Sequence, residues 1–511
     1  MKKLDIGVIV TTLIIVTISC SLAFFAARVV GEPKDINLVA KNVAVTFNDT
    51  SIIANGVVSP GWNTTKTFTI TNNSKEEYKY NISIKDLINT FVTKGYLQYK
   101  ITSTNNGYSM TEFKDIPKSS APKDTILAYS VVIPNGVTQS YTIEFKYIND
   151  ESVDQSDDMG KQLSGTLFIT EGTDEPTFYS TLLSDRGIAT TNRTTFNSTF
   201  DSTDQVLYTA KEDNKTVYYF AGNVTTNWVK FGKNENNQDL YWRIIRTNSD
   251  GGVRLLYHGT STTATDAYIG TSMFNEKDYD SMYVGYMYGT SNATAIDRSN
   301  TNNSTIKTAI DNWYVSNMTS YTKYLSTTAV YCNDREVGSG TYSATGSSFN
   351  YAALTRLNTN KTPTYTCTNT GDKFTVDSST GNGKLTYPVA LMTADEISYA
   401  GGLYANYNTN AWYFRNAKEG TLTTSSSSTD ASYSSTGSTW WWLLSPHYWN
   451  GSGARVFGVG GSSGPGRLDV AYVRYTFGVR PAVSLKSCVK TSGGDGSASA
   501  PYTIEESTSG C

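Results

Sequence analysis

Near its start the chain carries a long apolar stretch, Ile6 to Ala27, with Lys2 and Lys3 before it and Arg28 after it. A stretch of this length can cross a hydrocarbon layer of roughly 30 Å as a helix. Because basic residues favour the cytoplasmic side, the two lysines predict that everything after Arg28 is exported. Residues 1–31 are therefore predicted to be a cytoplasmic stub and transmembrane anchor of a single-pass cell-membrane protein. A cleaved signal peptide is the alternative, although no A-x-A site closes the stretch.

The cysteines fit an extracellular location. Of the 5 cysteines, Cys20 lies in the anchor and four follow it. An even number in an exported region permits two disulfides, and proximity in the sequence favours the pairs Cys332–Cys367 and Cys488–Cys511. A zinc site is the alternative, but the chain has no CxxC motif and contains just 2 histidines. No metal site and no cofactor is therefore predicted.

Length and composition limit the fold and the partners. With 511 residues the chain is too long for one core, so several domains are expected. Charged residues make up 17% and the net charge is -3, which gives no electrostatic reason to expect a nucleic-acid partner. Tyrosines outnumber phenylalanines, 36 to 19. Together with abundant Thr, Ser and Asn, this is typical of β-rich extracellular domains.

Residues 34–171 read as a succession of strands separated by polar turns. Phe68 and Ile70 alternate with polar residues, a turn follows at Asn72-Asn73, and Tyr78 and Tyr80 resume the alternation. Period-two alternation with turns at this spacing predicts an all-β sandwich. The strand rhythm resembles the immunoglobulin-like surface and biofilm-matrix sandwiches of Gram-positive bacteria. Residues 172–203, rich in Thr, Ser and Asn, are predicted to be a linker.

Residues 204–490 are predicted to form an α+β domain, followed by a tail over 491–511. Ile306, Ile310, Trp313 and Tyr314 have helical spacing behind an Asn/Ser cap. A second, short helix is expected after the capping box at 393–396, and a hairpin should turn at 249–252. The remainder reads as strands and loops, including a Ser/Thr-rich surface loop at 421–438.

Five motifs in this domain carry a more specific likeness: YWRIIR, VYCNDR, LTYPVALMTADEISYAGG, WWWLLSP and GVRPAVSL. In their order and spacing they resemble the C-type-lectin-like domain of bacterial surface proteins related to the formylglycine-generating-enzyme fold. Several proteins of that group are targets of diversity-generating retroelements. The resemblance implies a rigid scaffold that displays a variable ligand-binding surface.

The stretch from Trp440 to Leu485 divides by chemistry into a framework and an interleaved set. The framework is apolar and spaced for strands, and we include Trp449 in it on residue type. The interleaved set combines Tyr and Arg with Ser, Gly and Asn, the composition of a paratope. Its members are His447, Tyr448, Asn450, Gly451, Ser452, Gly453, Gly458, Gly460, Gly461, Arg467, Asp469, Ala471, Tyr472, Arg474, Tyr475 and Phe477.

We predict that side chains of this set project from loops onto one exposed face and bind a partner. The partner would be a protein or glycan on another cell, a phage or a host surface. Retroelement diversification of AAC codons yields codons ending in C, which never encode Lys, Glu, Gln, Met or Trp. Lys, Glu, Gln and Met are absent from 443–485, as diversification predicts, although ordinary Gly/Ser/Tyr-rich turns would also lack them. The ligand-binding candidates are His447, Tyr448, Asn450, Ser452, Arg467, Asp469, Tyr472, Arg474, Tyr475 and Phe477.

Three other functions compete with a ligand-binding display protein. An enzyme is not expected: His258 and His447 are the 2 histidines, and no cysteine pair matches the active-site thiols of the related oxidases. A calcium-dependent sugar lectin is not expected either, because the Glu-Pro-Asn, Gln-Pro-Asp and Trp-Asn-Asp signatures are absent. Sugar could still stack on exposed Tyr or Trp without a metal. The last alternative is a structural or matrix surface protein that acts through the N-terminal sandwich.

Overall fold

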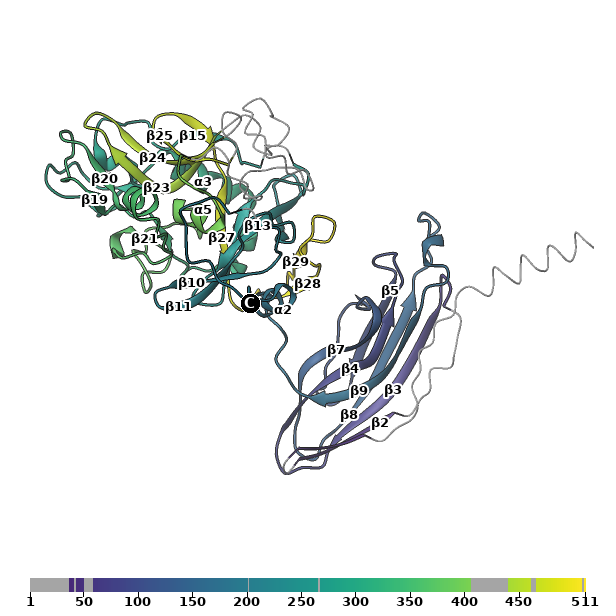
Figure 1. Ribbon diagram of the computed structural model, residues 1–511. Coiled ribbons are helices and arrows are strands. Elements are labelled where there is room, and N and C mark those ends of the chain that lie inside the picture. The colour runs from purple at the N-terminus through teal and green to yellow at the C-terminus, as the bar shows by residue number, and fades with distance from the viewer. Residues whose placement is uncertain are drawn as a thin grey trace, which may run out of the picture. The chain divides into compact units, whose positions relative to one another are not determined.

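The protein is mainly β-structure with few helices. The computed structural model describes residues 36–40, 43–49, 58–200, 202–264, 267–405, 440–460, 466–507 and 510–511. It divides into two compact units, Met1–Glu175 and Pro176–Cys511 (Figure 1). Within the described ranges no helix is long and apolar enough to span a membrane. The predicted anchor over 1–31 and the predicted loop over 421–438 lie outside those ranges.

The first unit encloses one hydrophobic core between two sheets, as the alternation predicted. The strand orders are β1-β2-β3-β8-β5-β6 in a 6-stranded sheet and β7-β4-β9 in a 3-stranded sheet. The first sheet consists of β1 (Ile36–Ala40), β2 (Val43–Asp49), β3 (Asn63–Asn72), β5 (Leu97–Ser103), β6 (Lys114–Asp115) and β8 (Thr138–Tyr147). The second consists of β4 (Tyr78–Asn89), β7 (Ser119–Ile133) and β9 (Leu163–Glu171).

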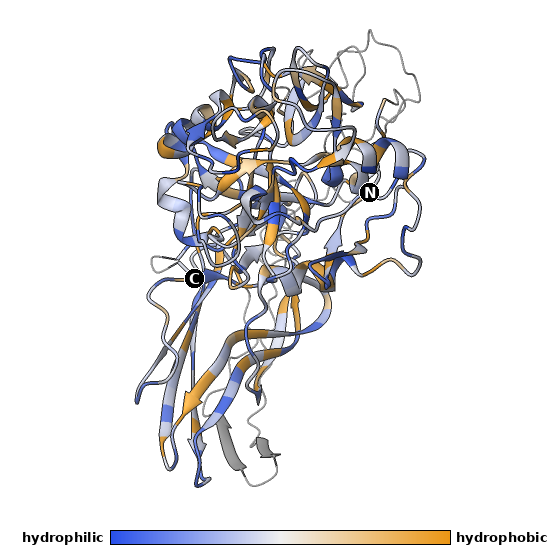
Figure 2. Cartoon of the chain, turned by 90° about the vertical axis from the view of Figure 1, so that its left-hand side faces the viewer, coloured by the Kyte–Doolittle hydropathy of each residue, from blue (hydrophilic) through white to orange (hydrophobic). Residues whose placement is uncertain are grey.

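Alternation explains why these strands bury one face against the core. In β3, Phe68 and Ile70 are buried between half-buried or exposed neighbours, and in the neighbouring strand β8 the same pattern buries Tyr141, opposite Phe68, and Ile143. Hydrophobic and hydrophilic residues alternate visibly along these strands (Figure 2). Because β3 and β4 belong to different sheets, the chain changes sheet after Asn72, at the predicted turn.

The second unit contains two large sheets. A 9-stranded sheet has the order β22-β27-β14-β13-β12-β29-β28, with β10 and β11 joined to β13. Its strands are β10 (Tyr208–Glu212), β11 (Lys215–Tyr219), β12 (Trp228–Lys233), β13 (Asp239–Thr247), β14 (Val253–Tyr257), β22 (Val389–Leu391), β27 (Pro481–Leu485), β28 (Thr491–Gly493) and β29 (Tyr502–Ile504). A 7-stranded sheet comprises β15 (Thr271–Met273), β19 (Val337–Ser339), β20 (Phe349–Tyr351), β23 (Trp441–Trp449), β24 (Ala454–Val459), β25 (Leu468–Tyr472) and β26 (Thr476–Gly478).

Short sheets and helices complete this unit. The two small sheets are β16 (Met287–Tyr288) with β17 (Asn302–Asn303) and β18 (Tyr331–Cys332) with β21 (Lys373–Phe374). The α-helices described are α2 (Phe178–Arg186), α3 (Thr305–Asn317), α4 (Ala352–Leu354) and α5 (Ala394–Ala400).

Local sequence signals located several of these elements correctly. Helix α3 begins behind Ser304, whose hydroxyl accepts the Lys307 N–H, and it buries Ile306, Ile310 and Tyr314. Helix α5 begins with the predicted capping box. Strands β13 and β14 pair as the predicted hairpin. In each case a short-range rule was sufficient, because the hydrogen bonds that end the element are formed within a few residues.

Two predicted boundaries differ from the structure. The predicted linker 172–203 contains helix α2, which buries Phe178 and Leu182 in the core of the second unit. The predicted tail 491–511 supplies β28 and β29, with Tyr502 fully buried. Both segments are rich in Ser and Thr, so their few apolar residues did not reveal that they complete the core.

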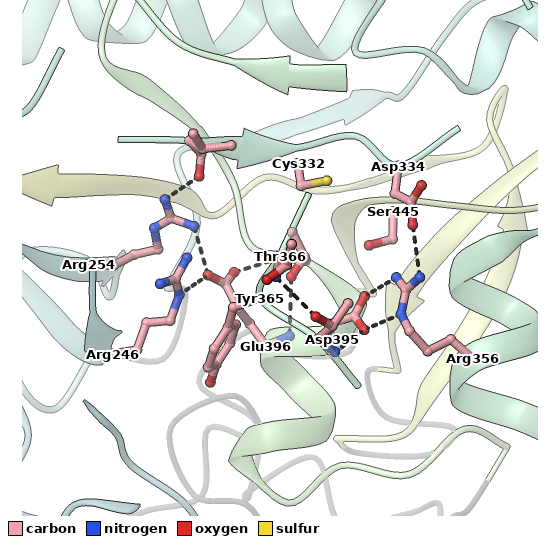
Figure 3. A pocket seen from close by; sticks show the side chains of 13 residues that line it. Arg246, Arg254, Cys332, Asp334, Arg356, Tyr365, Thr366, Asp395, Glu396 and Ser445 are labelled. Carbon is pink, nitrogen blue, oxygen red and sulfur yellow. Dashed lines mark hydrogen bonds and ion pairs between the residues drawn. The ribbon is translucent and has the colours of Figure 1, made fainter. Parts of the chain in front are cut away.

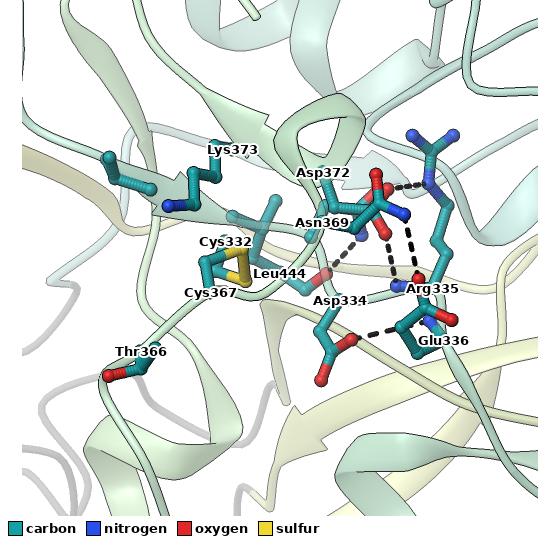
Figure 4. The surroundings of a disulfide bond; sticks show 12 residues. Cys332, Asp334, Arg335, Glu336, Thr366, Cys367, Asn369, Asp372, Lys373 and Leu444 are labelled. Atoms are coloured by element: carbon teal, nitrogen blue, oxygen red, sulfur yellow. Dashed lines mark hydrogen bonds and ion pairs between the residues drawn. A yellow bond between two sulfur atoms is a disulfide. The ribbon is translucent and has the colours of Figure 1, made fainter. Parts of the chain in front are cut away.

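Both favoured cysteine pairs are disulfides, Cys332–Cys367 and Cys488–Cys511. Beside the first bond, Arg335 forms a buried ion pair with Asp372 at 2.6 Å (Figure 4). Each of these charged residues follows a bonded cysteine by a few positions. The disulfide therefore joins the two chain segments that supply this ion pair.

Candidate ligand-binding face

Three adjacent strands of the 7-stranded sheet place polar side chains in one cross-strand row. In the antiparallel pairs β23–β24 and β24–β25, Tyr448 lies opposite Arg455, and Arg455 lies opposite Tyr472. Directly opposed residues project from the same face of a sheet. The register therefore brings these three side chains together, although they come from segments separated by a turn and by the residues that join β24 to β25.

Arg455 is held between the two tyrosine rings. Its guanidinium carbon lies 4.5 Å from the ring centroid of Tyr448 and 3.9 Å from that of Tyr472, within cation–π distance. Arg455 also donates a hydrogen bond to the Tyr472 hydroxyl. This hydrogen bond, more than any other contact, lowers the pKa of Tyr472 below its ordinary value.

Two exposed residues extend the row. The Tyr475 ring lies 5.6 Å from the Tyr472 ring, and Arg474 forms an ion pair with Asp278 at 2.8 Å. We call Tyr448, Arg455, Tyr472, Arg474 and Tyr475 the Tyr–Arg face. Tyr475 is 44% exposed, which makes it one of the more exposed large side chains of the second unit.

A rigid aromatic layer supports this face. Trp441, Trp442 and Trp449 are fully buried. The Trp442 indole donates to the Ser272 carbonyl at 2.8 Å, and its ring lies 4.6 Å from that of Phe477. Trp440 is half-buried and also contacts Phe477, with 5.4 Å between the rings. The tryptophans are thus framework, as their residue type suggested, and Trp449 belongs with them.

Most of the predicted binding residues are at least partly accessible. Eight of the ten are exposed or half-buried: Tyr448, Asn450, Ser452, Arg467, Tyr472, Arg474, Tyr475 and Phe477. Asn450 donates to the Tyr472 hydroxyl at 3.3 Å and thereby touches the Tyr–Arg face. Of these residues, Tyr448, Asn450, Tyr472, Arg474 and Tyr475 lie together at the Tyr–Arg face.

His447 is not exposed as predicted. Tyr448 pairs with Arg455 and Pro446 pairs with Val456, so His447 is an extra residue in β23, and such a bulge redirects a side chain. Its ring packs 4.5 Å from Phe457, and the residue is 1% exposed. Within the part of the chain that the structure describes, neither ring nitrogen has a hydrogen-bond partner. Burial, assisted by the positive charge of Arg455, lowers the pKa of His447 to about 3.

Asp469 and several small residues also differ from the prediction. Asp469 is buried, pairs with Arg467, and its pKa is raised by burial. A Cβ on Gly453 would lie 2.4 Å from Cε1 of Tyr472, so this glycine is required by close packing. The remaining buried members of the interleaved set are Gly458, Gly460 and Ala471, and Gly461 lies outside the described residues.

The sequence interpretation missed Arg455. The signal was present, because Ala454 and Val456 on either side of it are apolar, like the framework positions. In a strand, a residue between two inward-facing residues faces outward. Arg455 therefore belongs to the binding candidates, whereas His447 and Asp469 form part of their support.

A second polar cluster in this unit is closed. Arg246 and Arg254 both pair with Glu396, at 2.9 and 2.8 Å, and Arg356 pairs with Asp334 and Asp395, at 2.9 and 2.8 Å (Figure 3). Burial would raise the pKa of Glu396, but the two arginines outweigh burial and lower it. A cavity of about 20 Å³ remains among these groups, which is room for about one water. The arrangement suits a structural ion-pair network.

Comparison with known proteins gives little functional information. Residues 298–487, which include the Tyr–Arg face, match the model of a family described as "Domain of unknown function (DUF6273)". No curated protein matches the chain. One solved structure, titled "AvmM Catalyzes Macrocyclization in Alchivemycin A Biosynthesis", matches 29% of this chain and 98% of its own at 10% identity. Its TM-score is 0.15, a likeness too low to carry an argument.

Proposed function

We propose that the protein is a membrane-anchored, extracellular display protein that binds a ligand through the Tyr–Arg face. In this proposal the first unit is an immunoglobulin-like sandwich, and the second is a C-type-lectin-like domain that presents the face. The protein acts as a receptor or adhesin and not as an enzyme. The apolar stretch at Ile6–Ala27 supplies the anchor.

The observation that carries the proposal is the cross-strand row Tyr448–Arg455–Tyr472 above a buried tryptophan layer. Tyr and Arg dominate the energetics of protein interfaces because they combine large contact area with directional hydrogen bonds. Such residues bind best when a packed layer holds them in place before the partner arrives. The Tyr–Arg face has this composition and this support.

Diversification of the face is a further part of the proposal, restricted to the accessible positions. A retroelement can vary Tyr448, Asn450, Ser452, Tyr472 and Tyr475 without filling space in the core, because all five are exposed or half-buried. Gly453 is not in this group, since any side chain there would collide with Tyr472. A reverse transcriptase gene beside a near-copy of the coding stretch, differing at adenines, would support diversification.

A binding experiment with the full chain tests the proposal. The chain displayed on cells is incubated with arrays of bacterial, phage and host surface proteins and of glycans. The triple variant Tyr472→Ala/Arg474→Ala/Tyr475→Ala should lose the array signal, with the melting temperature nearly unchanged. The control variant Ile188→Ala/Val315→Ala, which truncates two exposed apolar residues outside the face, should keep both.

Each result has a definite meaning. Loss of binding accompanied by unfolding would make the face structural, and undiminished binding would place the ligand site elsewhere. A signal restricted to glycans and insensitive to a chelator would identify a metal-independent lectin that uses the same face. Self-assembly of the full chain with no array signal would favour a matrix role.

A further inference from the structure

We infer that Arg455 forms a subsite for a carboxylate, contributed by an Asp or Glu side chain of a protein partner. The inference rests on the proposed function and defines its ligand chemistry. Three features carry it: the ionic environment of Arg455, the unmet hydrogen-bonding capacity beneath it, and the composition around it.

Arg455 differs from its neighbours in having no counter-ion. No carboxylate lies within ion-pairing distance of it among the described residues, whereas Arg467 pairs with Asp469 and Arg474 with Asp278. Its described polar contact is the Tyr472 hydroxyl, and its buried Nε has no acceptor among the described residues. The face therefore keeps one positive charge that the surrounding side chains do not neutralise. A half-buried guanidinium of this kind attracts an anion.

His447 lies buried near Arg455, one residue before Tyr448 and close enough for the charge of Arg455 to act on it. Among the described residues, neither of its ring nitrogens has a hydrogen-bond partner. Since the ring is neutral at physiological pH, it keeps one N–H to donate. The Tyr404 ring lies 5.1 Å away, and burial raises the pKa of its hydroxyl, so this group also stays protonated. The unmet groups around Arg455 thus favour an acceptor.

The shape of the guanidinium selects a carboxylate. The guanidinium lies within cation–π distance of both tyrosine rings, and a ligand would bind it at its N–H-bearing edge. A carboxylate matches that edge with two parallel hydrogen bonds. Exposed tyrosines beside the subsite favour a protein partner, because Tyr and Arg concentrate in protein interfaces. The occupant is therefore an acidic residue on a protein surface.

Fluorescence anisotropy with the full chain tests the subsite. The probe is a fluorescein-labelled hexaglutamate peptide, and labelled hexaglutamine is the uncharged counterpart. Hexaglutamate should bind the unsubstituted chain, and Arg455→Gln should weaken it at least about tenfold, the loss of a charge-assisted hydrogen bond. Arg455→Lys should recover part of the affinity, because it restores the charge without the planar fork. Lys215→Gln removes the same charge at an exposed position on β11 and should leave the affinity unchanged.

The alternative outcomes overturn specific parts of the inference. Equal affinity for Arg455→Gln, or no binding of hexaglutamate, overturns the subsite. Binding of polysialic acid in place of hexaglutamate overturns the choice of a protein partner. If Arg455→Gln does not fold, glutarate must displace hexaglutamate from the unsubstituted chain where sodium chloride of equal ionic strength does not. If the partner found on the array binds Arg455→Gln as tightly as the unsubstituted chain, the carboxylate subsite is wrong but the Tyr–Arg face can still be the binding site. If the triple variant keeps its affinity for that partner, the Tyr–Arg face itself is not the binding site.

Discussion

In the second unit, Arg246 and Arg254 differ from Arg455 in whether a carboxylate of the described chain neutralises the guanidinium charge. Arg246 and Arg254 are buried, and both pair with Glu396. Arg455 is half-buried between tyrosine rings and pairs with no carboxylate in the described part of the chain. A buried charge is tolerated where its partners are complete, so the Glu396 network holds the fold. A charged side chain at the surface that has no counter-ion within the protein is available to bind another molecule.

One strand connects the two groups. At Ser445, strand β23 accepts a hydrogen bond at 2.9 Å from Ala394, the first residue of the helix that carries Glu396. Three residues later the same strand presents Tyr448 on the Tyr–Arg face. The Glu396 network thus holds β23 in place at Ser445, and the next part of the same strand contributes Tyr448 to the Tyr–Arg face. If this division is correct, substitutions in the network should cost stability, and substitutions in the face should cost binding.

The largest effect is expected from Glu396→Gln. It leaves Arg246 and Arg254 buried without their shared carboxylate, which should lower the free energy of unfolding by about 3–5 kcal/mol. Urea denaturation of the full chain measures this. The matched substitution on the face, Arg455→Gln, should cost less than about 1 kcal/mol. Similar losses from both would erase the distinction between the two groups.

Removing the Cys332–Cys367 disulfide should have the next largest effect. The double variant Cys332→Ser/Cys367→Ser opens a loop with a sequence separation of 35 and should lose about 2–4 kcal/mol. Ligand binding at a temperature where the variant is folded should be unchanged, because the bond lies beside the Arg335–Asp372 pair. Weakened binding in the folded variant would contradict this separation.

Acid should destabilise the fold through the histidine beneath the face. The pKa of His447 falls from 6.5 to about 3 on folding, so the unfolded chain takes up the proton first as the pH drops. The stability that His447 contributes should therefore be complete above pH 6.5 and decline by about 1.4 kcal/mol per pH unit toward pH 3. His447→Phe should make this decline shallower, as measured by urea denaturation at pH 7 and pH 5. If the free energy of unfolding falls equally with pH in His447→Phe and in the unsubstituted chain, the fold does not hold His447 neutral.

A small effect on stability is expected from Gly453→Ala. Gly453→Ala places a Cβ 2.4 Å from Cε1 of Tyr472 and should displace that ring, at a cost of about 1 kcal/mol and a severalfold loss of binding. Ser452→Ala, at the exposed neighbouring position, should change stability by less than about 0.5 kcal/mol. Thermal denaturation and the array assay distinguish the two variants. Full binding by Gly453→Ala would mean that Tyr472 need not be held in place.

Sequence signals foresaw the elements whose determinants are local. The capping box of α5, the Ser304 cap of α3 and the alternation in β3 each depend on residues a few positions apart. Helix α2 and strand β29 were not predicted, because their apolar residues are sparse. These residues can be recognised as core residues only when distant segments of the chain have come together. Composition alone could not separate such segments from linkers.

The candidate face could be predicted only in outline. Residue type correctly marked Tyr472, Arg474 and Tyr475 as accessible. It failed for His447, since the bulge in β23 depends on pairing with β24, which no single strand encodes. Arg455 was not predicted, although its position between the apolar residues Ala454 and Val456 places its side chain on the outward face of the strand. The sequence does not show the register of β23 against β24, that is, which residues of the two strands lie opposite one another.

The central claim is that a fixed aromatic layer carries side chains that can change freely. The most direct test is a protease-resistance screen of full-chain variants displayed on cells, randomised at Tyr448, Asn450, Tyr472, Arg474 and Tyr475. The account predicts that most of these variants resist protease like the unsubstituted chain, whereas a library randomised in the tryptophan layer is mostly degraded. Widespread degradation of the first library would contradict the claim.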